Sequence, residues 1–139
     1  MINGSCACQS MQFTLTGSLS PAWHCWCRTC RKCHGTPFAT HTVAQQIDFH
    51  WHKGETLLQR FESSPGKFRC FCPTCGTHLF ILEADHPEII IVVYGSLDSD
   101  QLPMPVGHMF TQHQPTWFCC HDNLPKYSQW PPKQLFDTV

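Results

Sequence analysis

Two short cysteine pairs constrain the fold of this chain more than any other feature. Cys6-Ala7-Cys8 stands near the start, and Cys72-Pro73-Thr74-Cys75-Gly76 stands past the middle. Side chains two residues apart on an extended segment point to the same side, so the first pair presents its sulfurs together. The second pair is typical of a zinc knuckle, in which two thiolates flank a tight turn that a glycine completes.

Each pair supplies half of a tetrahedral site, in which zinc–sulfur bonds of about 2.3 Å place the sulfurs about 3.8 Å apart. Both spacings can meet that distance. We therefore interpret Cys6, Cys8, Cys72 and Cys75 as ligands of one structural zinc ion rather than as ordinary buried cysteines of a β core. Such a site would tie the start of the chain to its middle.

A second cysteine group, Cys25-Trp26-Cys27-Arg28-Thr29-Cys30, repeats the first spacing and adds a third thiol. If the first site is complete, this group holds three ligands, and zinc with three protein ligands keeps a fourth position for water or substrate. The sequence therefore predicts two zinc ions per chain, with Cys25, Cys27 and Cys30 at the catalytic one. Cys33 is an alternative fourth thiolate that would close this site, and His24 and His34 are further candidate ligands.

Three thiolates leave a divalent zinc with one net negative charge, so it is a weak Lewis acid toward water. It can still hold a substrate thiol as an ionised nucleophile, which favours sulfur transfer or thiol addition. Arg28, Arg31 and Lys32 stand beside this group. They could bind a carboxylated thiol substrate or offset the charge of the thiolates, and both interpretations stay open.

Composition narrows the class of protein. The chain has 11 cysteines and 10 histidines among 139 residues, and only 14% of its residues are charged. The cysteines are odd in number and grouped, which favours metal ligands in a reducing compartment over disulfides, so we expect a cytoplasmic protein. A net charge of -1 argues against nucleic acid as a partner. The longest apolar run, at 89–94, is far shorter than the about 20 residues that a bilayer requires.

Short alternating or β-branched segments separated by turn signals predict a mainly β fold of several small antiparallel sheets in one domain spanning residues 1–139. We expect strands at 11–16, 22–26, 38–43, 47–51, 57–61, 68–71, 79–82 and 89–94. At most one helical turn is expected near 28–33. Six prolines after residue 100 indicate an extended arm over the sheets.

The chain resembles the glutathione-dependent formaldehyde-activating enzyme family, which also contains centromere protein V. The matching segments, in order along the chain, are Gly4-Ser5-Cys6-Ala7-Cys8, Cys25 to Lys32 with Gly35-Thr36-Pro37-Phe38, Phe49 to Gly54, Ser63-Ser64-Pro65-Gly66, Arg69 to Gly76, Gly95-Ser96-Leu97-Asp98 and His108-Met109-Phe110. Their order and spacing cover nearly the whole chain.

The resemblance implies a fold of coiled antiparallel sheets called a β-tent, with two zinc sites. By position, it implies that the cysteine pairs at 6/8 and 72/75 form the structural site. The group Cys25, Cys27 and Cys30 then forms the catalytic one. The implied activity is formation of S-hydroxymethylglutathione from formaldehyde and glutathione, classed as a carbon–sulfur lyase in reverse. In such a reaction zinc would hold the glutathione thiolate next to the carbonyl carbon.

Asp98 and His108 are candidate proton donors to the developing alkoxide. The alternative is that Asp98 caps its turn and His108 fixes the arm. We interpret Cys70, Cys119 and Cys120 as core or incidental thiols, because Cys70 would point to the opposite strand face from Phe71 and the vicinal pair Cys119-Cys120 lacks ligand spacing. A non-catalytic, zinc-stapled interaction module is the alternative function, favoured if Cys33 fills the second site. The oligomeric state is not readable from the sequence.

Overall fold

A computed structural model gives the structure of this protein and describes residues 1–133, so the last six residues of the expected domain lie outside it. Within residues 1–133 the strands form two sheets, and the prediction of a mainly β protein is confirmed. The small sheet has the order β1 (Ile2–Ser5), β2 (Gln12–Leu15), β5 (Phe49–Lys53). The large sheet has the order β10 (Gly107–Met109), β3 (Trp23–Cys25), β4 (Ala39–Gln45), β9 (Ile89–Val93), β8 (His78–Glu83), β7 (Lys67–Phe71), β6 (Gln59–Ser64).

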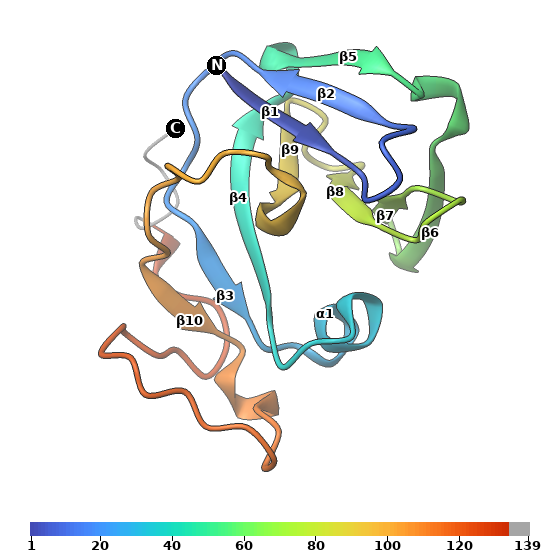
Figure 1. The fold of residues 1–139 in the computed structure, drawn as a ribbon. Coiled ribbons are helices and arrows are strands. Elements are labelled where there is room, and N and C mark those ends of the chain that lie inside the picture. Colours follow the sequence, from blue (N-terminus) through green and yellow to red (C-terminus); the bar gives the residue numbers. More distant parts are fainter. Residues whose placement is uncertain (134–139) are drawn as a thin grey trace.

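The small sheet lies across one end of the large one (Figure 1). A hydrophobic core lies between them, where the rings of Phe13 and Phe49 stack with centroids 4.7 Å apart. Gly4 has to lack a side chain, because a Cβ there would stand 2.2 Å from the Phe13 ring. A second, smaller core forms around Trp23 on β3 and Met109 on β10. The two cores contain different cysteines, which separates the two metal-ligand groups.

The eight expected strands all correspond to observed ones, with 3-10 turns at the starts of two of them. Two strands were not predicted, namely β1 and β10. The strand β10 pairs in parallel with β3, whereas every other strand pair within residues 1–133 is antiparallel. It stands at the sheet edge, where flanking prolines are tolerated. The 3-10 turns are η1 (Gln46–Asp48), η2 (Glu55–Leu57), η3 (Tyr94–Ser96) and η4 (Thr111–His113).

The helix α1 (Arg28–His34) is longer than the single turn that we expected. It begins after Cys27, whose sulfur accepts a hydrogen bond from the backbone N–H of Cys30 at 3.3 Å, as an N-cap side chain does. It ends at Gly35, whose φ of 61° is in the left-handed region and whose N–H bonds back to the Arg31 carbonyl. A seven-residue helix shows too few turns to produce a readable apolar stripe, which is why the sequence underpredicts it.

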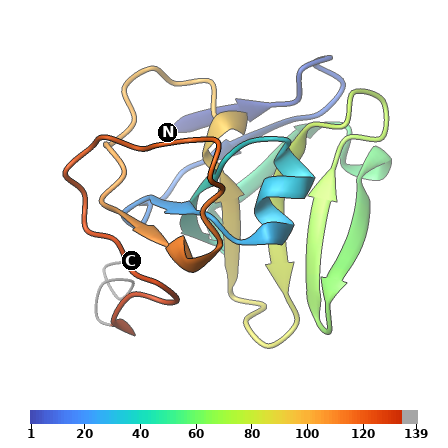
Figure 2. The same ribbon diagram turned by 90° about the horizontal axis from the view of Figure 1, so that it is seen from below.

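The segment after residue 100 forms the expected arm. It runs beside β3 and β10, on the opposite side of α1 from the β6–β7 hairpin (Figure 2). Backbone hydrogen bonds hold it, among them His108 N to Pro125 O at 2.8 Å and Tyr127 N to His108 O at 2.9 Å. No helix among residues 1–133 combines the length and apolar character that crossing a bilayer requires.

Candidate metal centres

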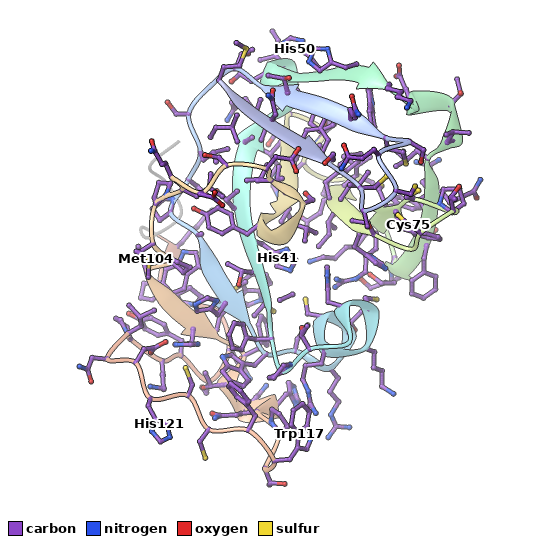
Figure 3. The ribbon with its side chains drawn as sticks, in the orientation of Figure 1. His41, His50, Cys75, Met104, Trp117 and His121 are labelled. Carbon is purple, nitrogen blue, oxygen red and sulfur yellow. The ribbon has the colours of Figure 1, made fainter. Side chains whose placement is uncertain are left out.

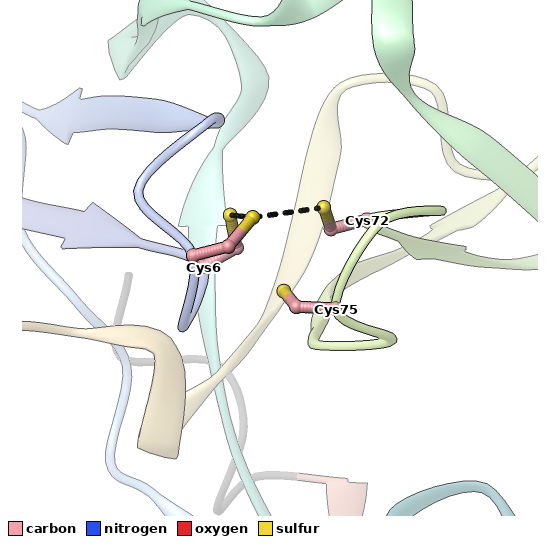
Figure 4. Close-up of side chains that lie close together, drawn as sticks. Cys6, Cys72 and Cys75 are labelled. Carbon is pink, nitrogen blue, oxygen red and sulfur yellow. Dashed lines mark hydrogen bonds between the residues drawn. The ribbon is translucent and has the colours of Figure 1, made fainter.

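The first cysteine group brings Cys6, Cys8, Cys72 and Cys75 together from two loops. All four sulfurs lie within 4.8 Å of one another. Cys8 Sγ lies 3.6 Å from Cys6 Sγ and 3.8 Å from Cys72 Sγ, close to the about 3.8 Å edge of a zinc–sulfur tetrahedron. Figure 4 shows the side chains pointing toward one another from the β1–β2 and β7–β8 turns.

Hydrogen-bond donors surround these four sulfurs, which are referred to below as the first cluster. The Met11 N–H donates to Cys6 Sγ at 3.3 Å, and the Ser10 hydroxyl lies 2.9 Å from Cys8 Sγ. The Thr77 hydroxyl lies 3.1 Å from Cys75 Sγ, and this hydrogen bond is the main cause that lowers the pKa of Cys75 to about 5. Gly76 holds the knuckle turn with a φ of 76°. Cys8 and Cys75 are exposed, so water also reaches this cluster.

The second cluster consists of Cys25, Cys27 and Cys30, whose sulfurs also lie within 4.8 Å of one another. Cys25 ends β3, Cys27 caps α1, and Cys30 lies in the first turn of α1. Cys25 and Cys30 are 5% and 3% exposed and belong to the smaller core. Only Cys27 is partly exposed, so an incoming ligand reaches the cluster on its side.

Ionisation is unevenly distributed within the second cluster. Hydrogen bonds from Cys25 and from Cys30 lower the pKa of Cys27 to about 2, and the same contact with Cys27 raises the pKa of Cys25. Without a metal ion the first proton therefore leaves Cys27. A divalent ion would displace the remaining protons, because metals bind cysteine as the thiolate.

A buried cation contacts this cluster. Arg69, on β7, is 3% exposed, and its Nη1 donates to Cys30 Sγ at 3.6 Å. Among residues 1–133 none of the ion pairs joins a carboxylate to Arg69. A buried guanidinium is costly unless a negative charge accompanies it, and neutral thiols would supply none. This surrounding fits a thiolate cluster that holds a metal ion.

Imidazoles complete the surroundings of the second cluster. His41 Nε2 lies 3.5 Å from Cys30 Sγ, and Figure 3 shows His41 on β4, between that strand and α1. Burial, followed by the charges of neighbouring residues including Arg69, lowers the pKa of His41 to about 3 and that of His34 to about 4. His78 shows a lowered pKa for the same two reasons. These rings are therefore neutral near pH 7 and cannot offset the charge of Arg69.

The structure does not bring Cys33 into the group of sulfurs that lie within 4.8 Å of one another. Its side chain instead lines a pocket of about 360 Å³, together with His34 and His78. His24 and His34 are likewise outside that group. His24 forms a 2.7 Å hydrogen bond with the Thr40 hydroxyl through Nδ1.

The three cations predicted beside the second cluster lie together. Arg28, Arg31 and Lys32 line one open pocket of about 570 Å³, which Trp117 of the arm also lines. Trp117 is 67% exposed and stands beside α1 in Figure 3. Arg31 is fixed by a 2.7 Å hydrogen bond from Nη1 to the His113 carbonyl. The pocket is a positively charged surface next to the residue that caps α1.

Asp98 and His108 have other partners than the cluster sulfurs. Asp98 is exposed and accepts a 2.9 Å hydrogen bond from Ser5 Oγ, beside the first cluster rather than the second. The fully buried His108 accepts a 2.8 Å hydrogen bond at Nδ1 from Trp26 Nε1 and contacts Asp122 at 2.9 Å through Nε2. An indole N–H only donates, so neutral His108 carries its proton on Nε2 and donates it to Asp122.

His24, His108 and Asp122 form a third group with metal-ligand spacing. Because the proton of His108 stands on the nitrogen that faces Asp122, this nitrogen has no lone pair for a metal ion. Instead, these hydrogen bonds connect Asp122 of the arm to His108 on β10 and to Trp26, the residue that follows β3. The Cys120 thiol donates to Asp122 Oδ2 at 3.2 Å, Cys119 is exposed, and Cys70 is buried in the main core.

Sequence reasoning missed two contacts of the second cluster, those of Arg69 and His41. A sequence signal existed for Arg69, which stands among apolar and aromatic residues on the strand before the zinc knuckle. A charged residue in the middle of such a strand indicates a buried partner. His41 had no comparable signal, because its contact arises only from the packing of α1 on β4.

Comparisons with known proteins agree with this arrangement. Residues 1–113 match the model of a family described as "Glutathione-dependent formaldehyde-activating enzyme". A curated protein of Halomonas elongata, named "Putative glutathione-dependent formaldehyde-activating enzyme", is 29% identical over 126 residues, which cover 84% of this chain and 79% of that protein. A crystal structure of a Rhodobacter sphaeroides protein superimposes with a TM-score of 0.58 at 21% identity, covering 73% of this chain and 90% of that one, and supports the fold.

Proposed function

The chain belongs to the glutathione-dependent formaldehyde-activating enzyme family, and on this basis we propose that it is a zinc-dependent carbon–sulfur lyase acting on glutathione–aldehyde adducts. The reaction joins the sulfur of glutathione to the carbonyl carbon of formaldehyde, and the thiol proton ends on the carbonyl oxygen. The observation that carries the proposal is the second cluster, in which three sulfurs and a buried guanidinium converge without a fourth cysteine.

Zinc bound by Cys25, Cys27 and Cys30 would supply a position at which a substrate thiol is held as its thiolate. The chain itself orients that position. Cys25 and Cys30 are buried in the smaller core, whereas Cys27 is partly exposed, so the substrate approaches from the side of Cys27. Holding both reactants there would replace a bimolecular encounter with an oriented one.

The basic pocket supports glutathione as the thiol. Glutathione carries two carboxylates, and Arg28, Arg31 and Lys32 line one open surface on α1, the helix that Cys27 caps. Arginine binds carboxylates through two parallel hydrogen bonds, and the exposed Trp117 ring offers an apolar wall for the peptide. We assign the carboxylates of the thiol substrate to this pocket and the thiol to the second cluster.

The structure also bears on the compartment and on the alternative function. All eleven cysteines are free thiols, which supports the proposal of a reducing, cytoplasmic location.

A closed structural site would require a fourth protein ligand at the second cluster. Cys33, on which that alternative depends, is not within the group of three sulfurs. The enzyme is therefore the function that the geometry supports better.

Exchange spectroscopy tests the proposal, because it follows turnover at equilibrium. Mixtures of formaldehyde and glutathione exchange spontaneously, and we expect the zinc-loaded protein to raise the exchange rate above that background. Cys27→Ser should return it to the background, and Cys33→Ala, on the same helix, should leave it raised. If the zinc-loaded protein gives only the spontaneous rate, the proposed activity is wrong.

A further inference from the structure

Arg69 contacts the second cluster, but neither the family match nor the sequence pattern assigns it a role. It lies in the middle of β7, paired with Phe61 on β6 and with Ile81 on β8. Its guanidinium reaches Cys30 Sγ at 3.6 Å, and its Nε is buried without a hydrogen-bond partner. Among residues 1–133, therefore, no carboxylate pairs with this side chain, and solvent hardly reaches it.

In the part of the chain that the structure describes, the groups near Arg69 are sulfurs and imidazoles rather than acids. His41 from β4 contacts Cys30 at 3.5 Å, and the His34 ring from α1 packs against both His41 and His78. The nearest cation on the same strand, Lys67, pairs with Glu83 at 3.1 Å. The negative charge that compensates Arg69 therefore comes from the second cluster itself.

Charge counting then indicates what Arg69 does. Three thiolates around a divalent ion carry one negative charge, and Arg69 brings this buried unit to neutrality. A neutral fourth ligand leaves the total at zero, whereas an anionic one brings it to one negative charge. Without Arg69 the same anionic ligand would bring a nearly solvent-free site to two negative charges, which is strongly unfavourable at low dielectric.

We propose that Arg69 is a positioning residue that raises the affinity of the second cluster for an anionic fourth ligand, a thiolate in particular, relative to a neutral one. The inference rests on the proposed function, because it concerns the ligand that the second metal ion accepts. It adds the residue that allows a buried site with three thiolates to accept a fourth one. The first cluster has no need of such a residue, because its four sulfurs are complete.

The test uses the cobalt-substituted protein, whose absorption bands report ligands added to the second cluster. Three probes are titrated separately at fixed pH, namely 2-mercaptoethanol as a thiol, azide as an anion without sulfur, and imidazole as a neutral ligand. We expect Arg69→Gln to weaken thiol and azide binding at least about tenfold relative to imidazole, which corresponds to about 1.4 kcal/mol. Arg69→Lys keeps the charge and should stay within about threefold of the wild-type protein.

Arg60→Gln is the matched control. Arg60 is an exposed arginine on the neighbouring strand β6, with its guanidinium 4.7 Å from the Phe68 ring centroid. Its substitution should therefore leave the affinities for all three probes unchanged. An unchanged ratio of anion to imidazole affinity in Arg69→Gln would overturn the inference. If Arg69→Gln loses the second cobalt ion, Arg69→Lys decides the question. Cobalt bands and anion-to-imidazole affinity ratios like those of the wild type in Arg69→Lys would support the role of charge. Absence of the bands in Arg69→Lys would overturn it.

The azide titration separates this inference from the proposed function. If thiols do not bind to the wild-type protein but azide binds and depends on Arg69, the proposed lyase fails and the role of Arg69 stands. If thiols bind equally well to the wild type and to Arg69→Gln, the role of Arg69 fails and the proposed lyase stands.

Discussion

The negative charge of the thiolates is compensated by different groups in the two cysteine clusters. The first cluster lies at the surface, where Cys8 and Cys75 are exposed and a backbone N–H and two hydroxyl groups contact the sulfurs. The second cluster is largely buried, and a single guanidinium accompanies its sulfurs. Water and dipoles suit a complete and inert site, whereas a fixed buried cation suits a site that has to admit another negative ligand.

The largest effect should come from breaking the first cluster. Cys6→Ser removes a ligand that joins the β1–β2 turn to the β7–β8 turn, and we expect loss of the folded state and, with it, of both metal ions. Structural zinc in small domains contributes about 10–16 kcal/mol of binding free energy, comparable with the about 5–15 kcal/mol that stabilises a whole domain. Metal content and far-ultraviolet circular dichroism measure both changes. A folded Cys6→Ser protein that retains both metal ions would contradict the structural role.

Breaking the second cluster should cost metal but not the fold. Cys27→Ser removes the partly exposed ligand at the start of α1, which packs against the smaller core but is not one of its buried residues, so the sheets should persist with one metal ion per chain. Cys33→Ala, which removes a thiol from the same helix, should retain two. Metal content and far-ultraviolet circular dichroism again measure these changes. If Cys33→Ala also loses an ion, the second site is closed by protein and the two clusters do not differ as we infer.

The sequence revealed the first cluster more completely than the second, for a physical reason. Local spacing determines that Cys6 and Cys8 share a face and that Cys72 and Cys75 flank a turn, so half-sites are readable residue by residue. The strand segments were readable in the same way, through alternation. The short strand β10 was missed because its three residues become a strand only by pairing with β3. The contacts of Arg69 and His41 likewise depend on elements that meet only in the folded protein.

Metal exchange should distinguish the two clusters by rate. We expect a chromophoric chelator to remove the second metal ion first, because three protein ligands leave a position at which the chelator can attack. Burial predicts the opposite order, because the first cluster has two exposed cysteines, Cys8 and Cys75, whereas the second has none. Cys27→Ser, which keeps only the first ion, should lose the fast phase of the release kinetics. If the fast phase persists in that variant, burial rather than ligand number governs exchange.

The smallest effect concerns His24, whose ring packs against His108 at a centroid distance of 4.9 Å. Burial, followed by the neighbouring His108, lowers the pKa of His24 from 6.5 to about 4. Between pH 6.5 and about 4, His24 therefore binds a proton in the unfolded chain but not in the folded one. The stability that depends on neutral His24 is therefore complete above pH 6.5 and is lost as the pH falls toward 4.

His24→Asn removes this titration, so the free energy of unfolding of the wild type should fall relative to the variant between pH 7.5 and 5.5. The wild-type free energy of unfolding, relative to that of the variant, should change with pH by less than the one-proton limit of about 1.4 kcal/mol per pH unit, because solvent screens the partly exposed ring. Urea unfolding at matched metal content measures it. His121→Asn, which removes an exposed histidine of the arm (Figure 3), is the control and should keep the wild-type slope. If His24→Asn keeps that slope too, then folding does not lower the pKa of His24, and the surroundings of its ring are more polar than its burial indicates.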